Sequence, residues 1–134
     1  MKKIAELNHV DFETFQNDVV PANEPAVFRS LVAEWPAVEQ CRSSAAATCQ
    51  YLKKLDIGTP VYTIAAPPDA GGRFFYRDDL QGVNFKRGQI PLSQVLGQLQ
   101  AQSNDGGSHA IAVQALSVRD TLPTFEKDNP KSRK

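Results

Sequence analysis

Proline and glycine residues divide this chain into short segments. The 134 residues include nine prolines and eight glycines, several of them placed where a helix or strand would otherwise continue. Proline disrupts hydrogen bonding inside a helix or a central strand, and glycine favours turns. The segments in between alternate between helical and strand-like patterns. We therefore predict one domain with an α+β fold in which strands are the minority.

Four segments have the composition or the apolar spacing of helices. Polar residues before two of them are suitable caps, because their side chains accept hydrogen bonds from the first turn of a helix. These residues are Asn8 or Asp11 for the first helix and Ser43 or Ser44 for the third. The predicted helices are residues 8–20, a helix starting at 34–38 with Pro36 in its first turn, residues 43–55 and residues 91–102.

Four other segments are β-branched, aromatic or apolar and predict strands. They are residues 26–29, 61–65, 73–76 and 109–118. Prolines and glycines in residues 67–72 predict a turn, so the second and third strands are expected to pair as a hairpin. Gly71 and Gly72 lack the spacing of a phosphate-binding loop, and a turn with positive φ explains them better.

The charge balance excludes several classes of partner. Fifteen basic residues balance fifteen acidic ones, which argues against nucleic acid or an anionic membrane as a partner. Aromatic and basic residues do interleave at residues 73–87, but Asp78 and Asp79 lie among them and would repel phosphates. No apolar run reaches the roughly 18 residues of a membrane span, and no secretory signal follows the first lysines. A cytoplasmic location is the default expectation.

The two cysteines are expected to be free thiols. Cys41 and Cys49 would lie about 12 Å apart along a single helix, too far for a disulfide. Two thiols alone also do not make a structural zinc site.

His9, Asp11 and His109 superficially resemble the two histidines and one carboxylate that bind non-haem iron. The spacing argues against this interpretation, because residues i and i+2 of a helix point about 200° apart. A small iron enzyme built on these three residues is therefore the weakest hypothesis, and a solvated helix start is preferred for His9 and Asp11.

The order of several short motifs resembles the cupin-like family related to JmjC oxygenases. The first motif is Pro25-Ala26-Val27-Phe28-Arg29-Ser30-Leu31-Val32, followed by Trp35-Pro36-Ala37. The second is Gly72-Arg73-Phe74-Phe75-Tyr76-Arg77-Asp78-Asp79-Leu80, followed by Gly82, Asn84-Phe85 and Pro91-Leu92. The third is Ala112-Val113-Gln114-Ala115, followed by Leu122-Pro123 and Phe125. Together they cover roughly residues 8–130, and Ser30 stands where the family usually has glycine.

The resemblance implies the N-terminal helices and early strands of a double-stranded β-helix, with the barrel incomplete. In such oxygenases the H-x-D metal motif follows the Leu-Pro segment, and the chain reaches Lys134 without it. Iron(II) and 2-oxoglutarate are thus implied for a full-length relative. For this chain we expect no cofactor, no catalytic residue and no metal ligand. We expect residues 1–126 to be the N-terminal part of a cupin-like domain, inactive alone, and residues 127–134 a polar basic tail.

Three residues are candidates for cosubstrate contacts through the same resemblance. Gln114 matches a glutamine that faces the pocket from an early strand, while Ile111 and Ala112 lie where relatives often have a cosubstrate-binding tyrosine. Tyr76 and Asn84 are candidates for the pocket rim. The alternative for Gln114 is a polar residue satisfied at a sheet edge.

An incomplete barrel would leave an apolar sheet face and unpaired edges. Three arrangements would cover that face: helices that fold back over it, self-association of two chains, or a missing C-terminal part supplied by another polypeptide. Self-association is favoured. The alternative function is a complete small α+β binding or interaction module without catalysis.

Overall fold

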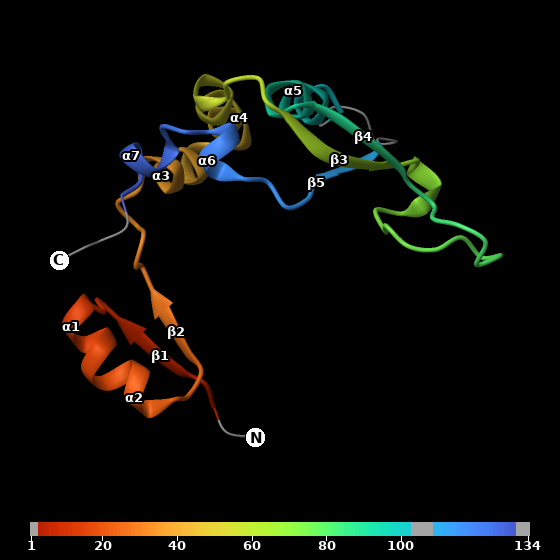
Figure 1. The fold of residues 1–134 in the computed structure, drawn as a ribbon. Helices are drawn as coiled ribbons and strands as arrows, with labels where there is room; N and C mark the ends of the chain where they lie inside the picture. The colour runs from red at the N-terminus through yellow and green to blue at the C-terminus, as the bar shows by residue number, and fades with distance from the viewer. Residues whose placement is uncertain (1–2, 103–108, 131–134) are drawn as a thin grey trace.

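The computed structural model describes residues 3–102 and 109–130, which form three parts (Figure 1). An N-terminal arm, residues 3–30, is followed by the first two members of a helix group and then by a sheet with one helix beside it, after which the chain returns to the helix group. The arm and the sheet lie on different sides of the helix group. The α+β prediction is confirmed, and the described strands form two small sheets rather than a closed barrel.

The arm is a parallel pair of strands joined by a short helical segment. Strand β1 (Ala5–Asn8) pairs with β2 (Ala26–Arg29), and between them lie α1 (Phe12–Thr14), the π-helical η1 (Phe15–Val19) and α2 (Val20–Ala22). Of the two predicted caps, Asp11 is the one used, because its Oδ1 accepts a hydrogen bond from the Thr14 N–H at 2.8 Å. Strand β1 was missed because Ala5–Asn8 lacks a β-branched or aromatic residue.

The helix group contains α3 (Pro36–Ser43), α4 (Ala45–Leu55), α6 (Val118–Thr121) and α7 (Phe125–Asp128). Pro36 is the first residue of α3, where its missing N–H costs nothing, and Ser44 caps α4 by accepting from the Ala47 N–H at 3.0 Å. Cys41 and Cys49 lie on the two separate helices α3 and α4, and both are free thiols as predicted.

Asn129 connects the C-terminal end of the described chain to these helices. It is 2% exposed, and its Oδ1 accepts a hydrogen bond at 3.0 Å from the Ala37 N–H in the first turn of α3. The indole N–H of Trp35 donates to the Pro130 carbonyl at 3.0 Å. Residues 127–130 of the predicted tail are therefore attached to the fold, and residues 131–134 lie outside the described part of the chain.

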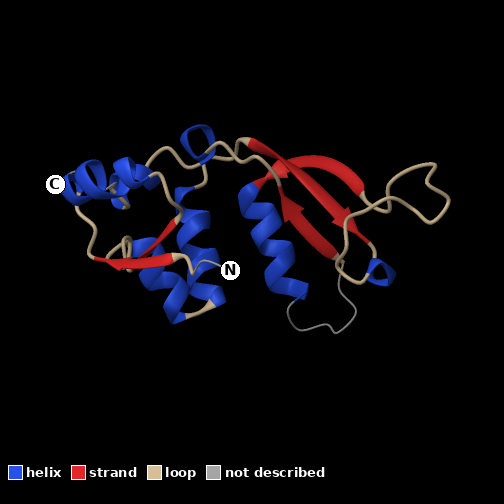
Figure 2. Cartoon of the chain, turned by 90° about the horizontal axis from the view of Figure 1, so that it is seen from below, coloured by secondary structure: helices blue, strands red, loops and turns tan. Residues whose placement is uncertain are grey.

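The second sheet has the order β4-β3-β5 and is antiparallel throughout. Its strands are β3 (Pro60–Ala66), β4 (Lys86–Pro91) and β5 (Ala110–Val113), and α5 (Leu92–Gln102) follows β4 directly and lies beside the sheet (Figure 2). The core lies between this helix, one sheet face and the helix group. Its buried members are Val61, Leu92, Val95, Leu96 and Leu122.

The predicted hairpin of residues 61–65 with residues 73–76 is wrong. The partner of β3 on this side is β4. The segment between the two strands contains the short 3-10 helix η2 (Pro68–Ala70), then a turn at Gly71 and Gly72, and then a loop over residues 73–85. In that loop, Tyr76 pairs with Val83 in an isolated bridge. Gly71 and Gly72 do adopt positive φ, at 56° and 76°. The strand predicted at residues 109–118 is shorter and ends at Val113.

Asp56 fixes the start of α5 from a distant part of the chain. Its Oδ2 accepts a hydrogen bond from the Ser93 N–H at 2.7 Å, and its Oδ1 accepts one from the Gly58 N–H at 3.0 Å. Partial burial alone would raise the pKa of Asp56, but these hydrogen bonds outweigh it and hold the pKa below its usual value. The carboxylate therefore stays charged beside the positive end of the α5 dipole.

Candidate functional site

The face of the three-stranded sheet opposite α5 carries a row of exposed polar side chains. Side chains alternate along a strand, so Val61 packs into the core while Tyr62 points to the other face and is 68% exposed. Gln89 is paired with Tyr62 on β4, and the backbone N–H of Gln114 donates to the Tyr62 carbonyl at 3.2 Å. Tyr62, Gln89 and Gln114, here called the Tyr62 row, thus run across all three strands.

A guanidinium lies beside this row on the same face. Arg87 is two residues from Gln89 along β4 and is paired with Ile64. Its guanidinium carbon lies 5.5 Å from the centre of the Phe85 ring, a cation–π arrangement. Phenol, amide and guanidinium groups on one exposed face are suited to hydrogen-bonding a carboxylate or amide ligand.

Gln114 is the only predicted site residue on this row. It is exposed and follows the end of β5, with Ala112 two residues before it on the same face. Tyr76 and Asn84 belong to the loop that precedes β4, beyond the opposite end of β3. The structure therefore does not bring the three candidates into one cluster.

Tyr76 and Asn84 share a shallow hollow with Asp69, Arg77 and Asp78. The Asn84 side chain is occupied with holding the loop together: its Oδ1 accepts from the Phe75 N–H and its Nδ2 donates to the Arg73 carbonyl, both at 2.9 Å. The ring of Tyr76 is 59% exposed and makes an edge contact with Phe75. Tyr76 therefore has the freer side chain of the two.

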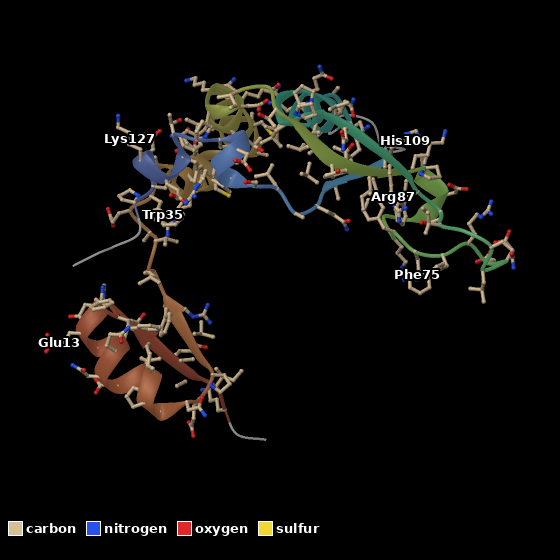
Figure 3. All side chains as sticks on the ribbon, viewed as in Figure 1. Glu13, Trp35, Phe75, Arg87, His109 and Lys127 are labelled. Carbon is tan, nitrogen blue, oxygen red and sulfur yellow. The ribbon has the colours of Figure 1, made fainter. Side chains whose placement is uncertain are left out.

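His9 and Asp11 lie in the arm, whereas His109 precedes β5 at the sheet. Figure 3 shows the separation, with Glu13 of α1 in the arm and His109 at the sheet. Hydrogen bonds from Thr14 lower the pKa of Asp11, consistent with its capping role. Across residues 3–102 and 109–130, no three histidine, cysteine, aspartate or glutamate side chains gather to hold a metal ion.

Sequence reasoning missed Tyr62, Gln89 and Arg87 as members of this face. Tyr62 was recognisable in principle, because it lies within a predicted strand between the two inward-facing residues Val61 and Thr63. Gln89 and Arg87 were not, because the strand that carries them was not predicted.

A comparison with family profiles matches residues 12–133 to the cupin-like domain. The chain belongs to the cupin-like domain family. No curated protein and no solved structure matches the chain at the threshold of the comparisons. In the part of the chain that the structure describes, no helix is long and apolar enough to cross a bilayer.

Iron(II), which the family resemblance implies, would need two histidines and one carboxylate on one face of the metal. His9 and Asp11 in the arm and His109 at the sheet are too widely placed to share one ion, and the described residues offer no other set. They therefore do not fit an iron centre. Ser30 has a positive φ of 59°, a backbone conformation that favours glycine, so the glycine expected at this position from the family resemblance has a structural reason.

Proposed function

We propose that this chain is the N-terminal part of a cupin-like, iron(II)- and 2-oxoglutarate-dependent oxygenase, and that residues 1–134 are inactive alone. Residues 1–126 would then be the early part of the cupin-like domain. Membership of the cupin-like family over residues 12–133 is the observation that carries this proposal. On this proposal, the iron ligands belong to later strands of the same domain.

The form of the three-stranded sheet supports the proposal. Strands β4 and β5 are its two outer strands, and among the described residues each has β3 as its one neighbour. Outer strands with free N–H and C=O groups are templates for further strands. The sheet face that carries the Tyr62 row is also partly uncovered, which suits a sheet that forms one wall of a larger barrel.

Gln114 is proposed to contact the cosubstrate from this wall. Its support is its exposure at the end of β5, on the face that also carries Tyr62 and Arg87. Tyr76 and Asn84 are proposed to lie at the rim of the pocket, Asn84 through the loop it holds in place. The cytoplasmic location remains part of the proposal, with no nucleic-acid or membrane partner.

The first test is the genomic DNA beyond the Lys134 codon, read in all frames. An H-x-D motif followed by alternating strand segments is expected. A stop codon followed by unrelated sequence would contradict the proposal and favour a complete binding module.

The second test is activity. Purified residues 1–134 are expected to give no succinate from 2-oxoglutarate in the presence of iron(II), whereas the extended chain is expected to produce it. Stoichiometric iron binding with turnover by residues 1–134 alone would refute the proposed inactivity.

A further inference from the structure

Arg87 is a charged residue without a charged partner on the open face of the three-stranded sheet. Strands β3, β4 and β5 contain two charged residues, Lys86 and Arg87, which are adjacent and so point to opposite faces. Arg87 is paired with Ile64 and shares the face of the Tyr62 row, whereas Lys86 is paired with Ala65. Within the part of the chain that the structure describes, no carboxylate forms an ion pair with Arg87. Its positive charge is therefore available to a ligand.

The Phe85 ring restricts where the Arg87 guanidinium lies. The ring centre is 5.5 Å from the guanidinium carbon. Cation–π attraction holds an arginine over an aromatic ring, while the N–H groups at the edge of the guanidinium stay free to donate. Ile64 beside Arg87 is 6% exposed, so a group bound to the guanidinium would lie partly out of water. Charge-assisted hydrogen bonds are stronger in such a setting.

Neutral hydrogen-bonding groups surround this charge. Tyr62 and Gln89 are a cross-strand pair, and Arg87 is two residues from Gln89, so the three side chains start within about 7–8 Å of one another. Among the described residues, none bonds to the Tyr62 hydroxyl or to the side-chain amides of Gln89 and Gln114. A sheet face that packs against another sheet is apolar, and an unpaired guanidinium under packed side chains is strongly unfavourable. This polar face is therefore suited to a ligand rather than to a packed core.

The single positive charge indicates which ligand group fits. The planar fork of an arginine matches a carboxylate, which accepts two parallel hydrogen bonds from it. Nucleic acids bind where several cations meet several phosphates, and the neighbouring cation of Lys86 points to the other face. One carboxylate balances the charge of Arg87, and the phenol and amide groups beside it can donate further hydrogen bonds.

Arg87 and Gln114 are too far apart to hold the same carboxylate. They are separated by two strand spacings and by two residues along the strands, about 12 Å in all. Arg87 follows Asn84 by three residues, so it lies toward the end of the sheet that carries the proposed pocket rim. The cosubstrate contact proposed for Gln114 and the Arg87 guanidinium thus belong to two subsites, and that of Arg87 is nearer the rim.

We propose that Arg87 binds a carboxylate group of the substrate, with Tyr62 and Gln89 as neutral hydrogen-bonding partners. The substrate class is then a small carboxylic acid. The inference rests on the proposed oxygenase function for the role of this ligand as substrate.

NMR titration of the full 134-residue chain with benzoate tests the carboxylate site. Benzamide has the same shape without the charge and is the control ligand. Benzoate should shift the signals of the Arg87 Nε–H and the Gln89 side-chain amide, with a dissociation constant of roughly millimolar order, and benzamide should not. Arg87→Gln should raise that constant about tenfold or more, and Arg87→Lys, which keeps the charge but loses the fork, should raise it less.

Lys86→Gln is the matched control variant, because it removes a neighbouring positive charge from the other face of the sheet. Benzoate binding should be unchanged in this variant. No saturable response to benzoate, equal responses to benzoate and benzamide, or equal losses in Arg87→Gln and Lys86→Gln would overturn the proposal. Circular dichroism checks that each variant is folded.

2-Oxoglutarate, which also carries carboxylates, separates the two sources of this group. In the extended chain, Arg87→Gln should leave the KM for 2-oxoglutarate in succinate formation within about twofold of the parent value. If Arg87→Gln raises that KM about tenfold, Arg87 serves the cosubstrate, and the inference fails while the proposed function stands. If the extended chain forms no succinate, the proposed function fails, and the benzoate titration still decides whether Arg87 is a carboxylate site.

Discussion

Replacing Asn129 by alanine removes three hydrogen bonds from the interior of the helix group. The Asn129 Nδ2 donates to the Tyr51 hydroxyl at 2.8 Å and to the Phe125 carbonyl at 2.9 Å, while its Oδ1 accepts from the Ala37 N–H at 3.0 Å. Each bond contributes about 1 kcal/mol net, and the polar groups left behind lose their partner in a buried setting. We expect the free energy of unfolding to fall by about 3 kcal/mol, equivalent to roughly 10 °C in Tm.

Urea unfolding followed by circular dichroism measures this change, at one fixed protein concentration because association would shift the midpoint. Tyr51→Phe is the control, since it removes one of the three hydrogen bonds and should cost about 1 kcal/mol. If Asn129→Ala and Tyr51→Phe lower the stability equally, Asn129 does not support α3 as argued.

Three further predictions follow from other positions. Ser30→Gly should raise the urea midpoint and stabilise the chain by roughly 0.5–1 kcal/mol, because glycine adopts positive φ without strain, and Ser30→Ala should give no such gain. The folded pKa of Asp56 is lowered, so its contribution to stability is present above the unfolded pKa of about 3.9 and is lost as pH falls through the folded value. Urea titrations at decreasing pH should therefore show that the free energy of unfolding falls less for Asp56→Asn than for the parent chain. Asn84→Ala should speed exchange of the Phe75 amide proton measured by NMR, whereas Gln114→Ala should leave it unchanged.

The sequence was informative where local pattern decides the structure. The helix at residues 91–102 was predicted from its apolar spacing, and α5 spans Leu92–Gln102. Strand β3 was predicted from the β-branched residues that it contains, and it extends the predicted segment by one residue at each end. Pro36 and Ser44 also act as expected at the starts of α3 and α4.

Local pattern failed where distant residues decide the structure. Strand β4 contains Lys86, Arg87, Gly88 and Gln89, whose intrinsic strand preference is weak. Pairing with β3 makes this segment a strand, whereas the more strand-like aromatic residues 73–76 lie in a loop. The Tyr62 row was hidden for the same reason, because its member Gln89 and the neighbouring Arg87 depend on that pairing. Gln114 was found through family resemblance rather than through its own local pattern.

The first turns of α3 and α5 are each held by a side chain from elsewhere in the chain, Asn129 for α3 and Asp56 for α5. Asn129 follows Ala37 by 92 residues, so during synthesis α3 leaves the ribosome long before its cap exists. A peptide of residues 36–43 alone would be too short to hold a helix in water. We therefore expect this helix to become stable late, as a result of chain closure, with its amide protons protected only when the C-terminal residues have docked.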